Sequence, residues 1–186
     1  ARAAVDASPH GRIGVIGTYG TVGSGAYPAA IAALAPAAHV IARACPLFVP
    51  LIEEGWIAHP VTRQVAEEYL LELRNAGLES LILGCTHYPL IAPLLADLMG
   101  PVVTLVDSGA EAARAVAALL AERGQLAGAG RPEHRYFLSD EPRNFTRIAE
   151  AFLGRALPAP TIVDETDASW FERTRQDPAA SRGGTR

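Results

Sequence analysis

Short apolar runs of strand length alternate with longer helical stretches along most of the chain. Glycine or proline bounds most of the runs, which is typical of buried strands in a parallel sheet. Strands that alternate with helices favour a parallel, doubly wound α/β sheet. The predicted strands lie at residues 12–18, 39–44, 81–83 and 102–107, and the predicted helices at 22–34, 60–76, 89–98 and 108–123.

The same alternation continues more weakly toward the C-terminus. We predict a strand at residues 134–140, a helix at 142–153 and an edge strand at 161–163. From about residue 164 the chain is polar and rich in proline, glycine and arginine, so 164–186 is predicted to be a disordered tail. Helical periodicity places one stripe inward in each of two helices: Val61, Val65, Tyr69, Leu70 and Leu73 in the first, and Phe145, Ile148, Ala149 and Phe152 in the second.

One apolar run, at Ser80–Pro89, ends in a cluster of chemically active residues. The strand stops at Gly84, and Cys85, Thr86 and His87 follow before a proline begins the next helix. In open α/β sheets, the carboxyl ends of parallel strands face the crevice where ligands bind. A cysteine that leaves this edge toward a helix N-terminus lies in a field that favours thiolate. Cys85 is therefore a candidate reactive thiol.

Both cysteines have a purely structural alternative. Most free cysteines behave as small buried hydrophobes, but the polar neighbours of Cys85 argue against that role for it. Cys45 lies between Ala44 and the apolar run that starts at Pro46. We expect Cys45 to pack inside the protein and not to act as the partner base of Cys85.

A glycine-rich turn follows the first predicted strand, at residues 17–25. A dinucleotide fingerprint does not fit it, because the third glycine would fall on Pro28 and the next strand does not end in an acid that could bind ribose. Two interpretations remain. The turn is either a tight strand-to-helix connection or an anion site whose amides hold a substrate carboxylate.

The composition excludes several classes of protein. A net charge of −4 gives no basic surface for nucleic acid, and no apolar run is long enough to span a membrane. Two cysteines without a secretory signal indicate a reducing, cytoplasmic location. All sixteen basic residues are arginine, so this chain has no lysine that could bind pyridoxal phosphate.

Four collinear segments resemble the glutamate racemases of the aspartate/glutamate racemase superfamily. Residues 83–90, Leu-Gly-Cys-Thr-His-Tyr-Pro-Leu, resemble the second catalytic-cysteine motif of that family. Residues 13–27, 45–53 and 106–108 resemble the opening of its second domain, the segment that follows and the strand that returns to the first domain. The resemblance covers residues 1–163 and implies two α/β domains, with the substrate between them and one cysteine from each.

The resemblance also implies a domain organisation. Residues 1–11 would end a first-domain helix, 12–105 would form the second domain with the catalytic cysteine, and 106–163 would be C-terminal elements of the first domain. The family's first-domain motifs, Asp-Ser-Gly-x-Gly-Gly and Ala-Cys-Asn-Thr-Ala, do not occur in this chain. We therefore expect a C-terminal portion that lacks most of the first domain and is inactive alone.

By resemblance, the activity would be a racemase that needs no cofactor or metal and interconverts L- and D-glutamate for peptidoglycan synthesis. Two cysteines would act as acid and base, and a thiol suits this task because its free pKa of about 8.5 allows it both to take and to return a proton. Cys85 would be the acid/base on one face, Thr86 would hold a substrate carboxylate, and His87 would assist Cys85 and contact the substrate. The structural alternative for His87 is a histidine bonded to backbone at a strand end.

Other functions stay open at this point. The chain could belong to an aspartate or hydantoin racemase, or it could be an inactive remnant or a protein-binding module. A homodimer is compatible with the sequence. The sequence itself does not indicate the oligomeric state, activation by cell-wall precursors or binding to gyrase.

Overall fold

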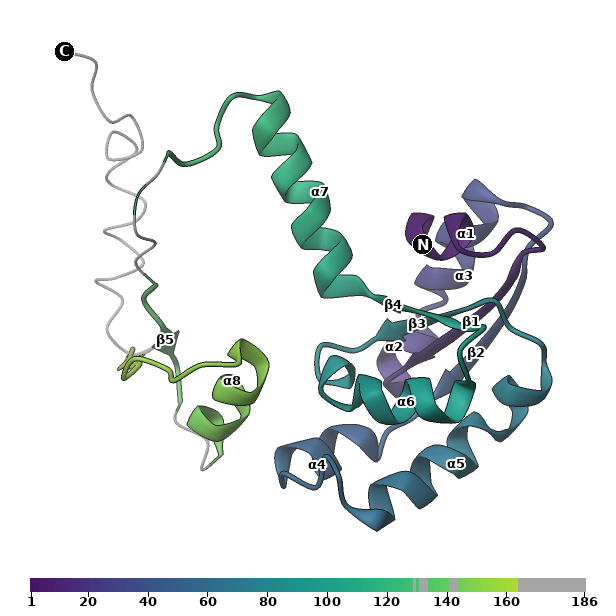
Figure 1. Cartoon of the computed structure of the whole chain (residues 1–186), viewed down its shortest axis with the longest axis horizontal. Helices are drawn as coiled ribbons and strands as arrows, with labels where there is room; N and C mark the ends of the chain where they lie inside the picture. The colour runs from purple at the N-terminus through teal and green to yellow at the C-terminus, as the bar shows by residue number, and fades with distance from the viewer. Residues whose placement is uncertain (129, 131–133, 141–143, 164–186) are drawn as a thin grey trace. The chain divides into compact units, whose positions relative to one another are not determined.

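The computed structural model describes residues 1–128, 130, 134–140 and 144–163, which fall into two units divided after Gly130. The first unit is built around one sheet with helices on both faces (Figure 1). Its elements, in chain order, are α1 (Arg2–Asp6), β1 (Arg12–Gly17), α2 (Tyr19–Gly23), α3 (Ala26–Leu34), β2 (His39–Ala44), α4 (Phe48–Glu53), α5 (Pro60–Asn75), β3 (Ser80–Gly84), the 3-10 helix η1 (Tyr88–Ile91), α6 (Ala92–Met99), β4 (Thr104–Asp107) and α7 (Ser108–Glu122).

The four strands pair in the order β2-β1-β3-β4, and every pair is parallel. Gly17 at the end of β1 pairs with Ala44 of β2 on one side and with Gly84 of β3 on the other. Leu83 pairs with Asp107 of β4, so all four strands end at the same edge. The predicted parallel α/β architecture is confirmed.

Alternate side chains of the strands enter two separate cores. Ile13, Val15 and Ile82 belong to the core that includes Ala4 of α1 and Ile31 of α3. Ile16, Leu81 and Leu83 belong to the larger core beneath α4, α5, η1 and α6. Figure 1 shows these two helical layers on opposite faces of the sheet. The doubly wound arrangement follows from strands that are apolar on both faces.

Three elements differ in detail from the prediction. The helix expected at 22–34 is divided into α2 and α3 by Gly25, whose φ of 64° is left-handed. The helix expected from residue 89 begins as the 3-10 helix η1 before α6. The strand expected at 102–107 is shortened to β4, because residues 101 and 102 form a turn after α6.

The buried stripe of α5 agrees with the predicted one at Leu70 and Leu73 and differs from it in the first turns of the helix. Val61 is exposed, whereas the fully buried positions include Thr62, which was not expected to lie inside. The hydroxyl of Thr62 donates a 2.6 Å hydrogen bond to the carbonyl of Trp56, which satisfies its polar group in the core. The buried residues of α5 are Thr62, Ala66, Leu70 and Leu73.

The helix α1 packs on the sheet of this unit. It contacts α3, β3 and β4, and the buried hydroxyls of Ser8 and Ser80 lie 2.8 Å apart beneath it. At the same amino-terminal edge, Glu79 accepts hydrogen bonds from the backbone amides of His10 and Arg12. The assignment of residues 1–11 to a first domain stays a prediction.

Among its described residues, the second unit contains a small parallel pair of strands and one helix. The strand β5 (Phe137–Leu138) pairs with β6 (Thr161–Ile162), and α8 (Phe145–Leu153) lies between them in sequence. Phe145 is partly buried, but Phe152 is 43 % exposed, so its predicted inward position is wrong. The assignment of 106–163 to a first domain stays a prediction, and the tail predicted at 164–186 lies outside the described residues.

Within the described ranges, no helix is both long and apolar enough to cross a membrane.

Candidate active site

The strand order places a topological switch point between β1 and β3. After β1 the chain passes to α3, over the core that contains Ile31, and after β3 it passes to η1 and α6, over the opposite core. The connections therefore separate at the carboxyl ends of these two strands, which is the place where doubly wound proteins bind ligands. Gly17 and Gly84 are the paired residues at this point. Cys85 is the first residue beyond the carboxyl end of β3.

Gly84 is required by the close packing at this edge. A Cβ atom at Gly84 would lie 2.7 Å from the carbonyl oxygen of Ile16 and 3.1 Å from the ring of Tyr27. The first distance is shorter than real Cβ contacts, and the atom that it meets is backbone, which cannot swing away. A glycine here lets β3 end tight against β1, which fixes where Cys85 begins.

The three residues predicted to form the site lie together beyond β3. Cys85 Sγ lies 4.0 Å from His87 Nδ1, and Thr86 Oγ1 lies 3.4 Å from the same nitrogen. Cys85 is a free thiol of intermediate exposure that packs against the larger core, and Thr86 is exposed. The thiol is thus accessible and lies within contact distance of an imidazole.

A fourth group, Glu53, was missed by the sequence analysis. Its carboxylate Oε1 lies 3.1 Å from His87 Nε2, on the side of the ring opposite Cys85. A carboxylate at Nε2 favours the proton on that nitrogen, which leaves Nδ1 as an acceptor facing the thiol. Its only signal in the sequence was its position as the last residue of the 45–53 segment, which we had identified by resemblance without assigning it a role.

Cys45 lies in an environment unlike that of Cys85. It is fully buried, and its thiol donates only a long hydrogen bond, 3.7 Å, to the carbonyl of Arg43. Burial raises the pKa of the Cys45 thiol to about 12, against the opposing effect of the Arg43 charge. The prediction that Cys45 packs inside is confirmed.

The glycine-rich turn connects β1 to a short helix. Thr18 caps α2 by accepting a hydrogen bond from the amide of Thr21 at 3.3 Å, and the two hydroxyls lie 3.1 Å apart. The methyl of Thr21 would touch a Cβ built on Gly84, so this turn adjoins the start of the Cys85 segment. The turn is a tight strand-to-helix connection, and the alternative anion site stays a prediction.

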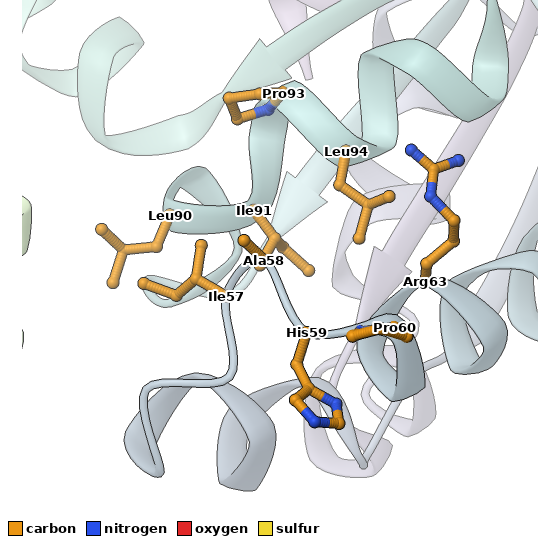
Figure 2. A pocket seen from close by; sticks show the side chains of 9 residues that line it. All are labelled: Ile57, Ala58, His59, Pro60, Arg63, Leu90, Ile91, Pro93 and Leu94. Carbon is orange, nitrogen blue, oxygen red and sulfur yellow. The ribbon is translucent and has the colours of Figure 1, made fainter.

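A separate apolar pocket of about 600 Å³ lies between the loop before α5 and the η1–α6 segment (Figure 2). Its walls include Ile57, Leu90 and Leu94, while Arg63 at its rim is held by Asp97 at 2.7 Å. Cys85, Thr86 and His87 do not line it. Among the residues that the structure describes, no three His, Cys, Asp or Glu side chains could hold a metal ion together.

Comparison with known proteins gives a consistent result. Residues 1–116 match the family model of Asp/Glu/Hydantoin racemase. The chain is 48 % identical over 160 residues to a glutamate racemase of Syntrophus aciditrophicus. The aligned region covers 85 % of this chain and 59 % of that protein. It is 47 % identical over 162 residues to a glutamate racemase of Geobacter metallireducens, which covers 84 % of this chain and 58 % of that protein.

Solved structures show the same likeness. A glutamate racemase isoform from Bacillus anthracis aligns with a TM-score of 0.79 at 34 % identity, over 88 % of this chain and 61 % of that one. A glutamate racemase from Francisella tularensis in complex with D-glutamate aligns with a TM-score of 0.76 at 35 % identity. This alignment covers 83 % of this chain and 58 % of that one. This chain spans slightly less than 60 % of the length of the two curated relatives.

The parallel sheet, the cysteine at its switch point and these matches agree, and the chain belongs to the Asp/Glu/Hydantoin racemase family.

Proposed function

We propose that this chain supplies one of the two acid/base groups of a glutamate racemase, and that this group is the Cys85 thiol. The observation that carries the proposal is the line of contacts from Cys85 through His87 to Glu53 at the carboxyl end of β3. The curated relatives are named glutamate racemases, and the Francisella tularensis structure holds D-glutamate. Both support glutamate over aspartate as the substrate.

The proposed chemistry is a proton transfer at the α-carbon. The Cys85 thiolate takes the α-proton from one face, the electron pair stays on carbon and its carboxylate, and a second acid returns a proton to the other face. A carbanion formed in this way needs fixed hydrogen-bond donors. The amide and hydroxyl of Thr86, next to the thiol, are suited to hold the substrate carboxylate.

His87 and Glu53 serve the thiol in this proposal. With the proton of His87 held on Nε2 by Glu53, Nδ1 acts as the acceptor of the thiol proton and so generates thiolate. In the reverse direction the imidazole returns that proton. Glu53 contacts the imidazole of His87 and acts on the thiol through it, so it is a positioning residue and not a catalytic one.

The second acid/base must come from outside this chain. Inversion needs an acid/base group on each face of the α-carbon. Cys45 is buried, and its thiol pKa is raised to about 12, far above neutral pH. Without the opposite wall, the 186-residue chain should neither hold glutamate in the required geometry nor exclude water from it. The D-glutamate formed by the complete enzyme would supply peptidoglycan synthesis in the cytoplasm.

The proposal is tested with a chimera in which the part of the Bacillus anthracis racemase that this chain does not match is joined to this chain. Incubation with L-glutamate should abolish the circular dichroism signal of the amino acid, and Cys85→Ala should prevent the loss. A chimera that racemises L-aspartate but leaves L-glutamate unchanged would overturn the assignment in favour of an aspartate racemase. A Cys85→Ala chimera with full activity would overturn the role of the thiol.

A further inference from the structure

We propose that Tyr88 is a positioning residue that keeps the His87 imidazole between the Cys85 thiol and the Glu53 carboxylate. The role of these three groups in catalysis rests on the function proposed above. Tyr88 follows His87 directly and is fully buried. Its hydroxyl donates a 2.8 Å hydrogen bond to the backbone carbonyl of Cys45, just beyond the end of β2. One side chain thus connects the turn after β3 to the turn after β2, across the strand β1 that lies between them.

The contacts of the neighbouring residues His87 and Tyr88 close a ring. Tyr88 holds the start of the 45–53 segment at Cys45, and His87 contacts its end at Glu53. The helix α4 lies between these two contacts and ends at Glu53. The position of the Glu53 carboxylate beside the imidazole therefore depends on where the segment is fixed at both ends. Tyr88 provides the fixed point farther from the imidazole.

Packing keeps the Tyr88 ring from moving. It meets Phe48 of α4 edge-to-face, with ring centroids 5.3 Å apart at 89°, and Phe48 meets Tyr69 of α5 in the same way at 5.3 Å and 85°. The Tyr69 hydroxyl accepts a hydrogen bond from the amide of Leu47 at 3.3 Å. Two phenols on different elements thus hold the segment 45–48 that leads into α4. Burial raises the pKa of Tyr88, so its hydroxyl stays protonated and remains a donor at neutral pH.

Loss of the Tyr88 hydroxyl should act on the thiol through His87. Without this bond the turn after β3 is held to the 45–53 segment only by the packing of the ring on Phe48 among the contacts named here, and the imidazole can leave its place between Cys85 at 4.0 Å and Glu53 at 3.1 Å. The thiol would then lose its proton acceptor, although Cys85 itself is unchanged. A purely structural tyrosine would alter stability alone.

The experiment measures the rate of Cys85 alkylation by iodoacetamide in the full 186-residue chain, by mass spectrometry, between pH 6 and 9. Tyr88→Phe should lower the rate at pH 7 at least threefold and change its pH profile. The matched control is Ile91→Val, which removes a buried methyl group from the same 3-10 helix and leaves every hydrogen bond named here in place. Thermal unfolding of each variant is measured in parallel.

The outcomes separate positioning from stability. The proposal is supported if Tyr88→Phe slows alkylation while Ile91→Val, with a similar loss of melting temperature, does not. It is overturned if both variants slow alkylation in proportion to their loss of stability, or if neither does. Adding Glu53→Gln to Tyr88→Phe should slow alkylation by less than the product of the two single effects, because both act on the same imidazole; independent effects would also count against the proposal. Alkylation needs no glutamate, so these results stand apart from the racemase assignment.

Discussion

His87 Nε2 lies 3.1 Å from Glu53 Oε1, although the two residues are 34 positions apart in the sequence. The contact joins the end of α4 to the turn after β3 and gives the imidazole a defined partner on the side away from Cys85. The same arrangement, a carboxylate behind an imidazole behind a nucleophile or base, orients histidine in many enzymes.

Replacing Glu53 should slow catalysis without removing the catalytic groups. Glu53→Gln keeps the shape of the side chain but removes the charge that holds the proton on Nε2. We expect kcat of the chimera to fall roughly 10- to 100-fold, no more than loss of a general base would cost. The matched control is Glu54→Gln at the adjacent exposed position, which should leave kcat unchanged. Equal rates for both variants would show that the Glu53–His87 contact has no role.

Gly84 should tolerate no side chain. Gly84→Ala places a Cβ 2.7 Å from the Ile16 carbonyl, so β3 must move away from β1. We expect the free energy of unfolding, measured with urea, to fall by about 1–3 kcal/mol. Gly23→Ala is the control, because nothing lies within 4 Å of a Cβ there and its backbone is helical. Similar losses for the two variants would contradict the packing described at the switch point.

The buried Cys45 thiol should make the protein less stable at high pH. Its pKa is raised from an ordinary value of 9.0 to about 12, so between these values the unfolded chain releases a proton that the folded chain keeps. The unfolded state then binds fewer protons, and the free energy of unfolding falls as pH rises, by about 1.4 kcal/mol at pH 10.

The control for this effect is Cys45→Ala. The pKa values of Tyr69 and Tyr88 are also raised by burial, and they remain in both proteins. The difference between the two stability curves therefore reports the Cys45 thiol together with its effect on these two phenols, whose pKa values the Cys45 charge helps to raise. Urea unfolding from pH 7 to 10 should give curves that converge as pH rises, and parallel curves would show that Cys45 titrates normally in the fold.

Much of the sheet could be predicted because its strands are apolar on both faces. The run at 81–83 stops at a glycine, and this alone placed Cys85 at the carboxyl edge. The inward face of α5 was predicted at Leu70 and Leu73 but not at its start, because Thr62 looks like a surface residue until the carbonyl of Trp56 satisfies its hydroxyl. The break between α2 and α3 also depends on one residue, Gly25, whose left-handed backbone a run of alanines does not reveal.

The candidate site was predictable only within one segment. Cys85, Thr86 and His87 are consecutive, so their proximity follows from the chain itself. The contact with Glu53 depends on how α4 packs, through Phe48 and Ile52, into the core beneath η1. No periodicity in the sequence encodes a pair that only this packing brings together.

The central claim is that this chain contributes Cys85 as one base and that the other base comes from elsewhere. The formation of D-glutamate in deuterated water tests this claim most directly. The 186-residue chain and the chimera are each incubated with L-glutamate, with and without Cys85→Ala. The α-deuterium is followed by NMR, and the enantiomers are separated by chiral chromatography. We predict deuterated D-glutamate from the chimera with Cys85 intact and none from the other three samples. D-glutamate from the 186-residue chain, at a rate abolished by Cys85→Ala, would contradict the account, because the second base would then lie in this chain or in a second copy of it.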